Sequence, residues 1–272
     1  MHLDLHLHST CSDGSLTPQE VVVAARRAGL GMVALADHDT AAGVDAARAA
    51  AAAQGGIGVI TAAEFTCQFD GAEVHLLGYA FRSDEPGIRA ITDRAAEARR
   101  ERMAAMIERL RALGVAITAE DVTAEPECVS IGRMHLARAL VRLHAAGSVN
   151  DAFGRFIGDR ASAYVPSRGP AVADAIAAVN GAGGCAVWAH PSLEDARRFG
   201  ELKACGLAGV EALRPSLDPV SSAAMEQAAR EVRLFITGGS DWHGGTRPAL
   251  GSWFVTERHV GAFLERVGIP AS

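Results

Sequence analysis

The chain has 272 residues, with 26 lysines and arginines against 32 aspartates and glutamates, so its formal net charge is −6 at pH 7. This length suits one large α/β domain that carries an insertion. The negative charge argues against a broad electrostatic grip on long nucleic acid, but not against a small anionic substrate held by metals and a few arginines. The sequence contains neither a signal-peptide pattern nor a long apolar run, so we expect a cytoplasmic protein without membrane contact.

The cysteines agree with this expectation about the compartment. They are odd in number and show no Cys-x-x-Cys spacing: Cys11, Cys67, Cys128, Cys185 and Cys205. This usage is typical of reduced, mostly buried thiols rather than of a disulfide framework.

The first strand-like segment, residues 2–8, alternates polar and apolar side chains without a break. Side chains two positions apart share one face of a strand, so Asp4, His6 and His8 point one way and the intervening leucines the other. Two imidazoles beside a carboxylate on a rigid element are typical of a divalent metal site. Burying these groups without a metal would leave polar atoms without partners, so we expect the active site to begin here.

Strand-like runs alternate with helix-like ones over most of the chain. The expected strands are His2–Leu7, Met32–Ala36, Ile57–Ala62, Glu73–Ala80, Cys185–Ala189, Gly209–Leu213, Leu234–Thr237 and Trp253–Thr256. After the first strand, Thr17 can N-cap a helix that has Pro18 in its first turn, Glu20 completing a capping box, and Gly29 at its end. Further helices are expected over Ala41–Gln54, Val172–Asn180 and Ser221–Arg230. This alternation predicts parallel strands in a closed or nearly closed β/α barrel.

Residues 83–168 interrupt the alternation. A long segment, about Gly87–Leu113, is amphipathic, and we interpret its apolar stripe as core packing: Met103, Met106, Ile107, Leu110 and Leu113. A second helix is expected over Ile131–Ala145 with Ser130 as its N-cap. We therefore expect a barrel from residues 1–82 and 169–272, with a helical insertion at 83–168 over its active-site end. The insertion's arginine cluster is interpreted as a solvated face, with substrate contact as the alternative: Arg94, Arg99, Arg100 and Arg102.

Metal-type side chains stand where the predicted strands end. They are His6, His8, Asp13, His38, Glu64, His75, His190, Asp241 and His243. Any one of them alone is more often a satisfied core or surface residue than a ligand. The strand ends of a β/α barrel meet at one rim, however, so together these residues predict one shared metal centre.

The same segments form an ordered set of motifs that runs nearly the whole length of the chain. They are Asp4-Leu5-His6-Leu7-His8-Ser9, Ser12-Asp13-Gly14, Asp37-His38-Asp39, Ala189-His190-Pro191 and Gly239-Ser240-Asp241-Trp242-His243. In content and order they resemble the PHP (polymerase and histidinol phosphatase) family. The stretch Ile131-Gly132-Arg133-Met134-His135-Leu136-Ala137 resembles the inserted-domain motif of small bacterial PHP phosphoesterases, which cleave nucleoside 3′,5′-bisphosphates or trim short 5′-phosphorylated RNA. The resemblance implies a distorted, TIM-like barrel of seven strands.

The resemblance also implies two to three divalent metal ions. The first would be held by His6, His8, Glu64 and Asp241, the second by Glu64, His75 and His190, and the third by Asp13, His38 and His243. A mixed imidazole and carboxylate set without thiolate suits Mn²⁺, Fe²⁺ or Zn²⁺ and does not choose among them. We take Mn²⁺ as the prediction.

Three residues are candidates for contact with substrate. Arg133 lies in the first turn of its predicted helix, where backbone N–H groups favour an anion and the guanidinium can grip a phosphate in a bidentate fashion. The alternative for Arg133 is an ion pair with a surface carboxylate. His135 could donate to the same phosphate or protonate the leaving oxygen. Residues 159–163 lack the Lys-Pro pair that often precedes Tyr164-Val165 in the family, and Arg160 or Arg168 could take its place.

The predicted activity is hydrolysis of a terminal phosphate ester by metal-activated water. The expected substrate is a small nucleotide or a short RNA. Two alternatives stay open: a phosphatase for a small metabolite such as histidinol phosphate, and a non-catalytic PHP module that binds metal. The sequence does not give the oligomeric state.

Overall fold

The computed structural model describes residues 1–122, 126–245 and 248–270. In this part of the chain eight strands form one sheet, in the order β7-β6-β5-β4-β3-β2-β1-β8. Their bounds are β1 (His2–Leu7), β2 (Met32–Leu35), β3 (Gly58–Phe69), β4 (Ala72–Tyr79), β5 (Cys185–Trp188), β6 (Gly209–Leu213), β7 (Phe235–Gly238) and β8 (Val255–Thr256).

The sheet curls into a nearly closed barrel. The chain that leaves β7 returns to β1, where the backbone N–H of Asp241 donates to the carbonyl of His6 at 2.9 Å and that of His8 donates to Trp242 at 3.0 Å. This confirms the predicted distorted barrel of strands and helices. The short β8, which pairs antiparallel with β1, is an eighth strand beyond the seven expected from the family resemblance.

The prediction that the strands are parallel is wrong for the short β8 and for β4, which runs antiparallel to both β3 and β5. The two-residue turn Asp70-Gly71 joins β3 to β4 with φ of 49° and 79°, the geometry of a tight hairpin, and leaves no room for a crossover helix. Glu64 consequently lies within a long β3 rather than at the end of a strand. The reversal also brings the start of β4, with His75, to the rim where the parallel strands end.

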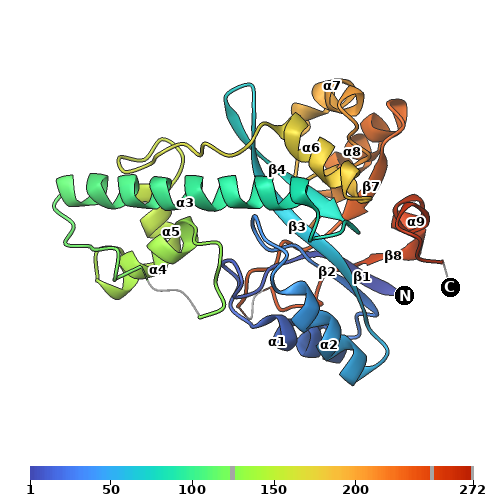
Figure 1. Ribbon diagram of the computed structural model, residues 1–272, viewed down its shortest axis with the longest axis horizontal. Helices are drawn as coiled ribbons and strands as arrows, with labels where there is room; N and C mark the ends of the chain where they lie inside the picture. The colour runs from blue at the N-terminus through green and yellow to red at the C-terminus, as the bar shows by residue number, and fades with distance from the viewer. Residues whose placement is uncertain (123–125, 246–247, 271–272) are drawn as a thin grey trace.

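Helices cover the outside of the barrel (Figure 1). They are α1 (Pro18–Arg27), α2 (Val44–Gln54), α6 (Val172–Gly181), η2 (Asp195–Arg198), α7 (Phe199–Ala204), α8 (Pro219–Glu231) and α9 (Glu257–Arg266). The predicted capping box of α1 is confirmed: Thr17 accepts from the backbone of Glu20, whose carboxylate accepts from the backbone of Thr17. None of the helices in the described ranges has the length and apolar composition needed to cross a membrane.

The segment between β4 and α6 extends to one side of the barrel (Figure 1). It contains α3 (Pro86–Ala112), α4 (Arg133–Arg142), α5 (Val149–Ala152) and the π-helix η1 (Phe153–Ile157). Its hydrophobic cluster, which includes Met106, Leu110 and Leu136, draws only on residues between 103 and 165. The boundaries at residues 83 and 168 stay a prediction.

The second predicted helix starts two residues later than expected. Ser130 is not its N-cap; that position belongs to Gly132, whose backbone N–H donates to Nδ1 of His135 at 3.0 Å. Gly132 leaves the backbone extended at φ −141° and gives the entering chain room beside Arg99.

Candidate active site

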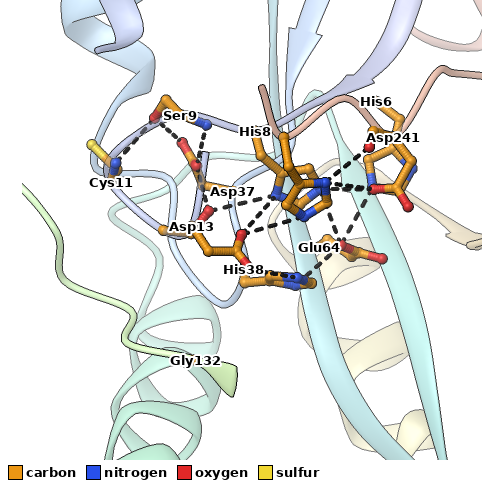
Figure 2. A network of polar contacts seen from close by, with 12 residues as sticks. His6, His8, Ser9, Cys11, Asp13, Asp37, His38, Glu64, Gly132 and Asp241 are labelled. Atoms are coloured by element: carbon orange, nitrogen blue, oxygen red, sulfur yellow. Dashed lines mark hydrogen bonds and ion pairs between the residues drawn. The ribbon is translucent and has the colours of Figure 1, made fainter. Parts of the chain in front are cut away.

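Four side chains from three parts of the barrel meet at its rim (Figure 2). Nε2 of His6 lies 3.3 Å from Glu64 Oε2 and 3.4 Å from Asp241 Oδ1. Nε2 of His8 lies 3.4 Å and 3.2 Å from the same two oxygens. The four ligand-type atoms lie within 4.8 Å of one another, a spacing that one cation could occupy.

Glu64 faces a second group of side chains with its other oxygen. Oε1 of Glu64 lies 2.8 Å from Nδ1 of His75 and 2.9 Å from Nε2 of His190. His38 approaches Oε2, with Nδ1 at 3.1 Å. Glu64 is therefore positioned to bridge two neighbouring cations.

The third predicted group also converges. Asp13 Oδ1 lies 3.3 Å from Nε2 of His243, and Oδ2 lies 3.9 Å from Nε2 of His38. His8, which the prediction placed only in the first group, approaches Asp13 with Nδ1 at 3.9 Å. The structure thus brings together all nine residues predicted from the sequence, and their role as metal ligands stays a prediction.

The buried atoms of this cluster fit divalent metal ions. Five of them have no hydrogen-bond partner among the described residues: Nε2 of His6 and His8, Nδ1 of His38, Oδ1 of Asp13 and Oε2 of Glu64. Leaving a buried polar atom without a partner costs about 1–3 kcal/mol. Cations between the imidazoles and carboxylates would satisfy all five at once, and a donor set without thiolate suits a first-row transition metal.

Glu211, which was not predicted from the sequence, orients two of the candidate ligands. This fully buried carboxylate on β6 lies with Oε1 at 2.9 Å from Nδ1 of His6, while Oε2 accepts from the backbone N–H of His190 at 3.0 Å. Such a partner fixes the ring so that the opposite nitrogen, Nε2, faces the cluster. A charged residue inside the apolar run Gly209–Leu213 was the available signal.

Two more aspartates hold the ligand-bearing loops. Asp4 accepts from the backbone of Ser240 at 2.9 Å and so fixes the segment that carries Asp241; burial raises the pKa of Asp4 to about 6. Asp37 accepts from Ser9 and Ser12, as Figure 2 shows for Ser9, with the Ser12 hydroxyl at 2.6 Å. The loop that bears Asp13 is therefore held from the barrel side.

A cavity of about 170 Å³ opens between the candidate ligands and the inserted helices. Asp13, His38 and His75 line its barrel wall; Arg99 and Arg102 of α3 and Arg133 of α4 line the opposite wall, together with Glu73 of β4. Arg94 and Arg100 are exposed. The interpretation of the arginine cluster as a solvated face is therefore wrong for two of its four members, because α3 turns Arg99 and Arg102 toward the barrel.

The three substrate candidates lie in different places. Arg133 lines the cavity, where it also contacts Asp159 at 2.8 Å. His135 is buried beside it, with Nδ1 accepting from Gly132 and Nε2 at 3.6 Å from the sulfur of Cys128, and burial lowers its pKa. The catalytic role of His135 stays a prediction. Arg168 is exposed and does not line this cavity; it lies in a separate depression that Arg102 also borders.

The chain resembles known proteins over most of its length. It is 33% identical over 253 residues to a 3′,5′-nucleoside bisphosphate phosphatase of Chromobacterium violaceum, covering 89% of this chain and 87% of that protein. Against a 5′-3′ exoribonuclease of Haemophilus influenzae it is 35% identical over 190 residues, 69% and 68% of the two chains. Against a phosphoribosyl 1,2-cyclic phosphate 1,2-diphosphodiesterase of Eggerthella lenta it is 32% identical over 266 residues, 91% and 97%.

A solved structure agrees with these relatives. The crystal structure of a metal-dependent phosphoesterase from Bifidobacterium adolescentis matches this fold with a TM-score of 0.86 and 34% identity, over 97% of this chain and 96% of that one. The model of the PHP domain matches residues 4–120, which contain six of the nine candidate ligands, from His6 to His75. The chain therefore belongs to the PHP family and is a metal-dependent hydrolase of phosphate esters.

Proposed function

We propose that this enzyme hydrolyses a terminal phosphate ester of a nucleotide substrate that carries a second phosphate, either a nucleoside 3′,5′-bisphosphate or a short 5′-phosphorylated RNA. The observation that carries the proposal is the cavity with two chemically different walls. Asp13, His38 and His75 on one wall can hold cations that engage the phosphate to be cleaved, and Arg133 on the other wall can contact a further phosphate.

The bound ions would be two or three in number, with Mn²⁺ preferred. They would supply an acidic water for hydrolysis and neutralise the phosphoryl oxygens. His6, His8, Glu64 and Asp241 would hold one ion, Glu64, His75 and His190 another, and Asp13, His38 and His243 the third. Elemental analysis of protein from Mn-supplemented medium should find this metal content, and trace metal only would contradict it.

The protein's own residues would position the substrate. Glu211 and Asp4 keep the imidazole of His6 and the Asp241 segment fixed before substrate arrives, so little reorganisation accompanies binding. Arg133 would draw the second phosphate to the helical wall, and buried His135 would hold the start of α4 through Gly132. The enclosed cavity favours a small substrate or a chain end over the interior of a long strand.

The test compares kcat/KM for adenosine 3′,5′-bisphosphate and for AMP in the Mn-loaded enzyme. We expect the bisphosphate to be the better substrate, and both activities to disappear on chelation. Equal values would contradict the nucleotide proposal and favour a phosphatase for a small metabolite such as histidinol phosphate.

A further inference from the structure

Arg102 enters the cavity from α3 with part of its hydrogen-bonding capacity unused. Nε donates to the carbonyl of Val165 at 2.7 Å, and Nη1 donates to Glu73 Oε2 at 3.0 Å. Nη2 is buried, in a side chain that is only 12% exposed, and it has no hydrogen-bond partner among the described residues. Because a buried charged donor without an acceptor is unfavourable, an anion bound at this nitrogen would stabilise the site.

Glu73 is the partly buried carboxylate that faces both Arg102 and Arg133. Its Oε2 lies 3.0 Å from Arg102, and its Oε1 lies 3.6 Å from Nη2 of Arg133. The other carboxylate near Arg133, Asp159, is 75% exposed, so solvent screens its charge. Two cations therefore share one partly buried carboxylate, and the local charge is unbalanced in favour of an added anion.

Arg99, the third arginine of this wall, is already neutralised. Its Nε donates to Asp39 at 2.6 Å and its Nη2 to the hydroxyl of Thr66 at 2.8 Å. The excess positive charge therefore belongs to Arg102 and Arg133. Both guanidiniums lie over the ring of Tyr164, with Cζ at 5.5 Å and 5.6 Å from its centroid, which holds them in a common orientation.

We propose that Arg102 and Arg133 form a second anion subsite for the phosphate that is not cleaved, with Glu73 as its resident counter-ion, and that Arg102 determines substrate specificity. This inference rests on the proposed function and deepens it. A phosphate monoester brings a charge near −2 and three acceptor oxygens, enough to engage the free Nη2 of Arg102 and both guanidiniums together. A neutral ribose hydroxyl at the same place cannot compete with Glu73 for hydrogen bonds from the two guanidiniums.

The subsite lies next to the candidate metal ligands, since Glu73 Oε1 is 3.7 Å from Nε2 of His75. A substrate whose two phosphates are separated by a single nucleoside would fit this arrangement better than one whose phosphates lie far apart. Arg102 thus distinguishes nucleotides phosphorylated on both sides of the ribose from those phosphorylated on one side.

The experiment measures kcat/KM for adenosine 3′,5′-bisphosphate, AMP and 3′-AMP in the Mn-loaded wild type, Arg102→Gln, Arg102→Lys and Arg94→Gln. For the bisphosphate we expect a fall of about 30-fold in Arg102→Gln, since a hydrogen bond to a charged group is lost in a buried site. Both monophosphates should change by less than about 3-fold. Arg94→Gln removes the same charge from an exposed position of the same helix and should leave all three values unchanged.

Arg102→Lys keeps the charge and the aliphatic stem but loses the planar fork, so it should also reduce the preference for the bisphosphate. This variant carries the test if Arg102→Gln fails to fold. Equal losses on all three substrates would overturn the proposal, because Arg102 would then serve the cleaved phosphate or the fold. Unchanged values would overturn it too. Failure of the proposed function is recognised separately, in a wild type that does not prefer the bisphosphate.

Discussion

The two walls of the active-site cavity are built on different principles. Behind the barrel wall, the candidate ligands His6, His8 and Glu64 lie in strands of the sheet or directly after one, are almost fully buried, and each keep a buried atom without a hydrogen-bond partner among the described residues. On the helical wall, Arg102 and Arg133 come from separate inserted helices and are held by Glu73 and Tyr164. The barrel side holds its geometry through strand pairing and through buried carboxylates such as Glu211 and Asp4, whereas the helical wall holds its geometry through contacts between side chains of separate elements.

This difference separates two tasks. Strand pairing fixes the candidate ligands to within the tolerance that metal coordination needs, so any change there should alter the chemistry itself. The arginines can change without moving a strand, so changes there should alter the choice of substrate. The names of the relatives include a bisphosphate phosphatase, an exoribonuclease and a cyclic phosphodiesterase. Such a range of substrates is expected if one barrel chemistry is combined with different substrate-binding walls.

The largest effect is expected on the barrel wall. His6→Ala removes a candidate ligand that Glu64, Asp241 and Glu211 surround, and it should abolish turnover. The affinity for metal should fall by more than about 100-fold, because losing even a residue that only orients a ligand costs up to about that much. Metal content by elemental analysis and kcat/KM are the measurements. His2→Ala, on the same strand but stacked on Phe254 at the surface, is the control. Wild-type activity in His6→Ala would show that the ligand assignment is wrong.

The junction between the walls should show the next largest effect. Arg99 of α3 forms a buried ion pair with Asp39, which is 1% exposed and follows the candidate ligand His38. Arg99→Met leaves that carboxylate unpaired and should lower the free energy of unfolding by about 3–5 kcal/mol. Urea denaturation measures this, with Arg94→Met as the control. A loss below about 1 kcal/mol would show that the two walls are not joined through this pair.

A smaller effect is expected on the helical wall. Arg133→Ala should cost about 2 kcal/mol of transition-state stabilisation with the bisphosphate, as loss of a charged phosphate contact does, while the metal content stays unchanged. kcat/KM and elemental analysis on the same preparation measure both. Loss of metal in Arg133→Ala would contradict the idea that the helical wall selects the substrate without affecting the metal centre.

Most of the barrel wall could be predicted from the sequence because most candidate ligands stand in short motifs near strand ends, which converge in this fold. Glu64 and His75 are the exceptions, since they lie inside β3 and β4. The direction of β4 could also have been read, since Asp70-Gly71 between alternating runs is a strong hairpin signal. Glu211 could be suspected only as a charge inside an apolar strand.

The helical wall could not be predicted in the same way. Whether Arg102 or Arg94 faces the cavity depends on how α3 rotates against the barrel, and that rotation is set by contacts distant in sequence, such as Arg99 with Asp39 and Arg102 with Glu73. Helical periodicity places Arg99 and Arg102 on one face but does not say what that face meets.

The smallest expected effect is the pH dependence of the free energy of unfolding in the metal-free protein, to which the two walls contribute differently. Burial lowers the pKa values of His75 and His243, but nearby carboxylates outweigh it: Glu64 and Glu73 raise that of His75 to about 10, and Asp13 and Asp241 raise that of His243 to about 9. Because the folded values exceed the unfolded value of 6.5, the stabilisation is fully present below pH 6.5 and is lost as pH rises through 9 and 10. Urea unfolding of the chelated protein should therefore show a loss of at least about 1.4 kcal/mol over this range, the equivalent of one pKa unit.

The helical wall adds nothing to this pH dependence, since guanidiniums do not deprotonate in this range. His243→Asn should flatten the pH profile of the chelated protein, whereas Arg133→Ala should leave its shape unchanged. Added metal should reverse the trend, because coordination requires neutral imidazoles and so strengthens as pH rises. A flat profile in the chelated wild type would mean that the imidazoles of the barrel wall are not held by their carboxylates in the absence of metal, and that the rigidity of this wall depends on the ions themselves.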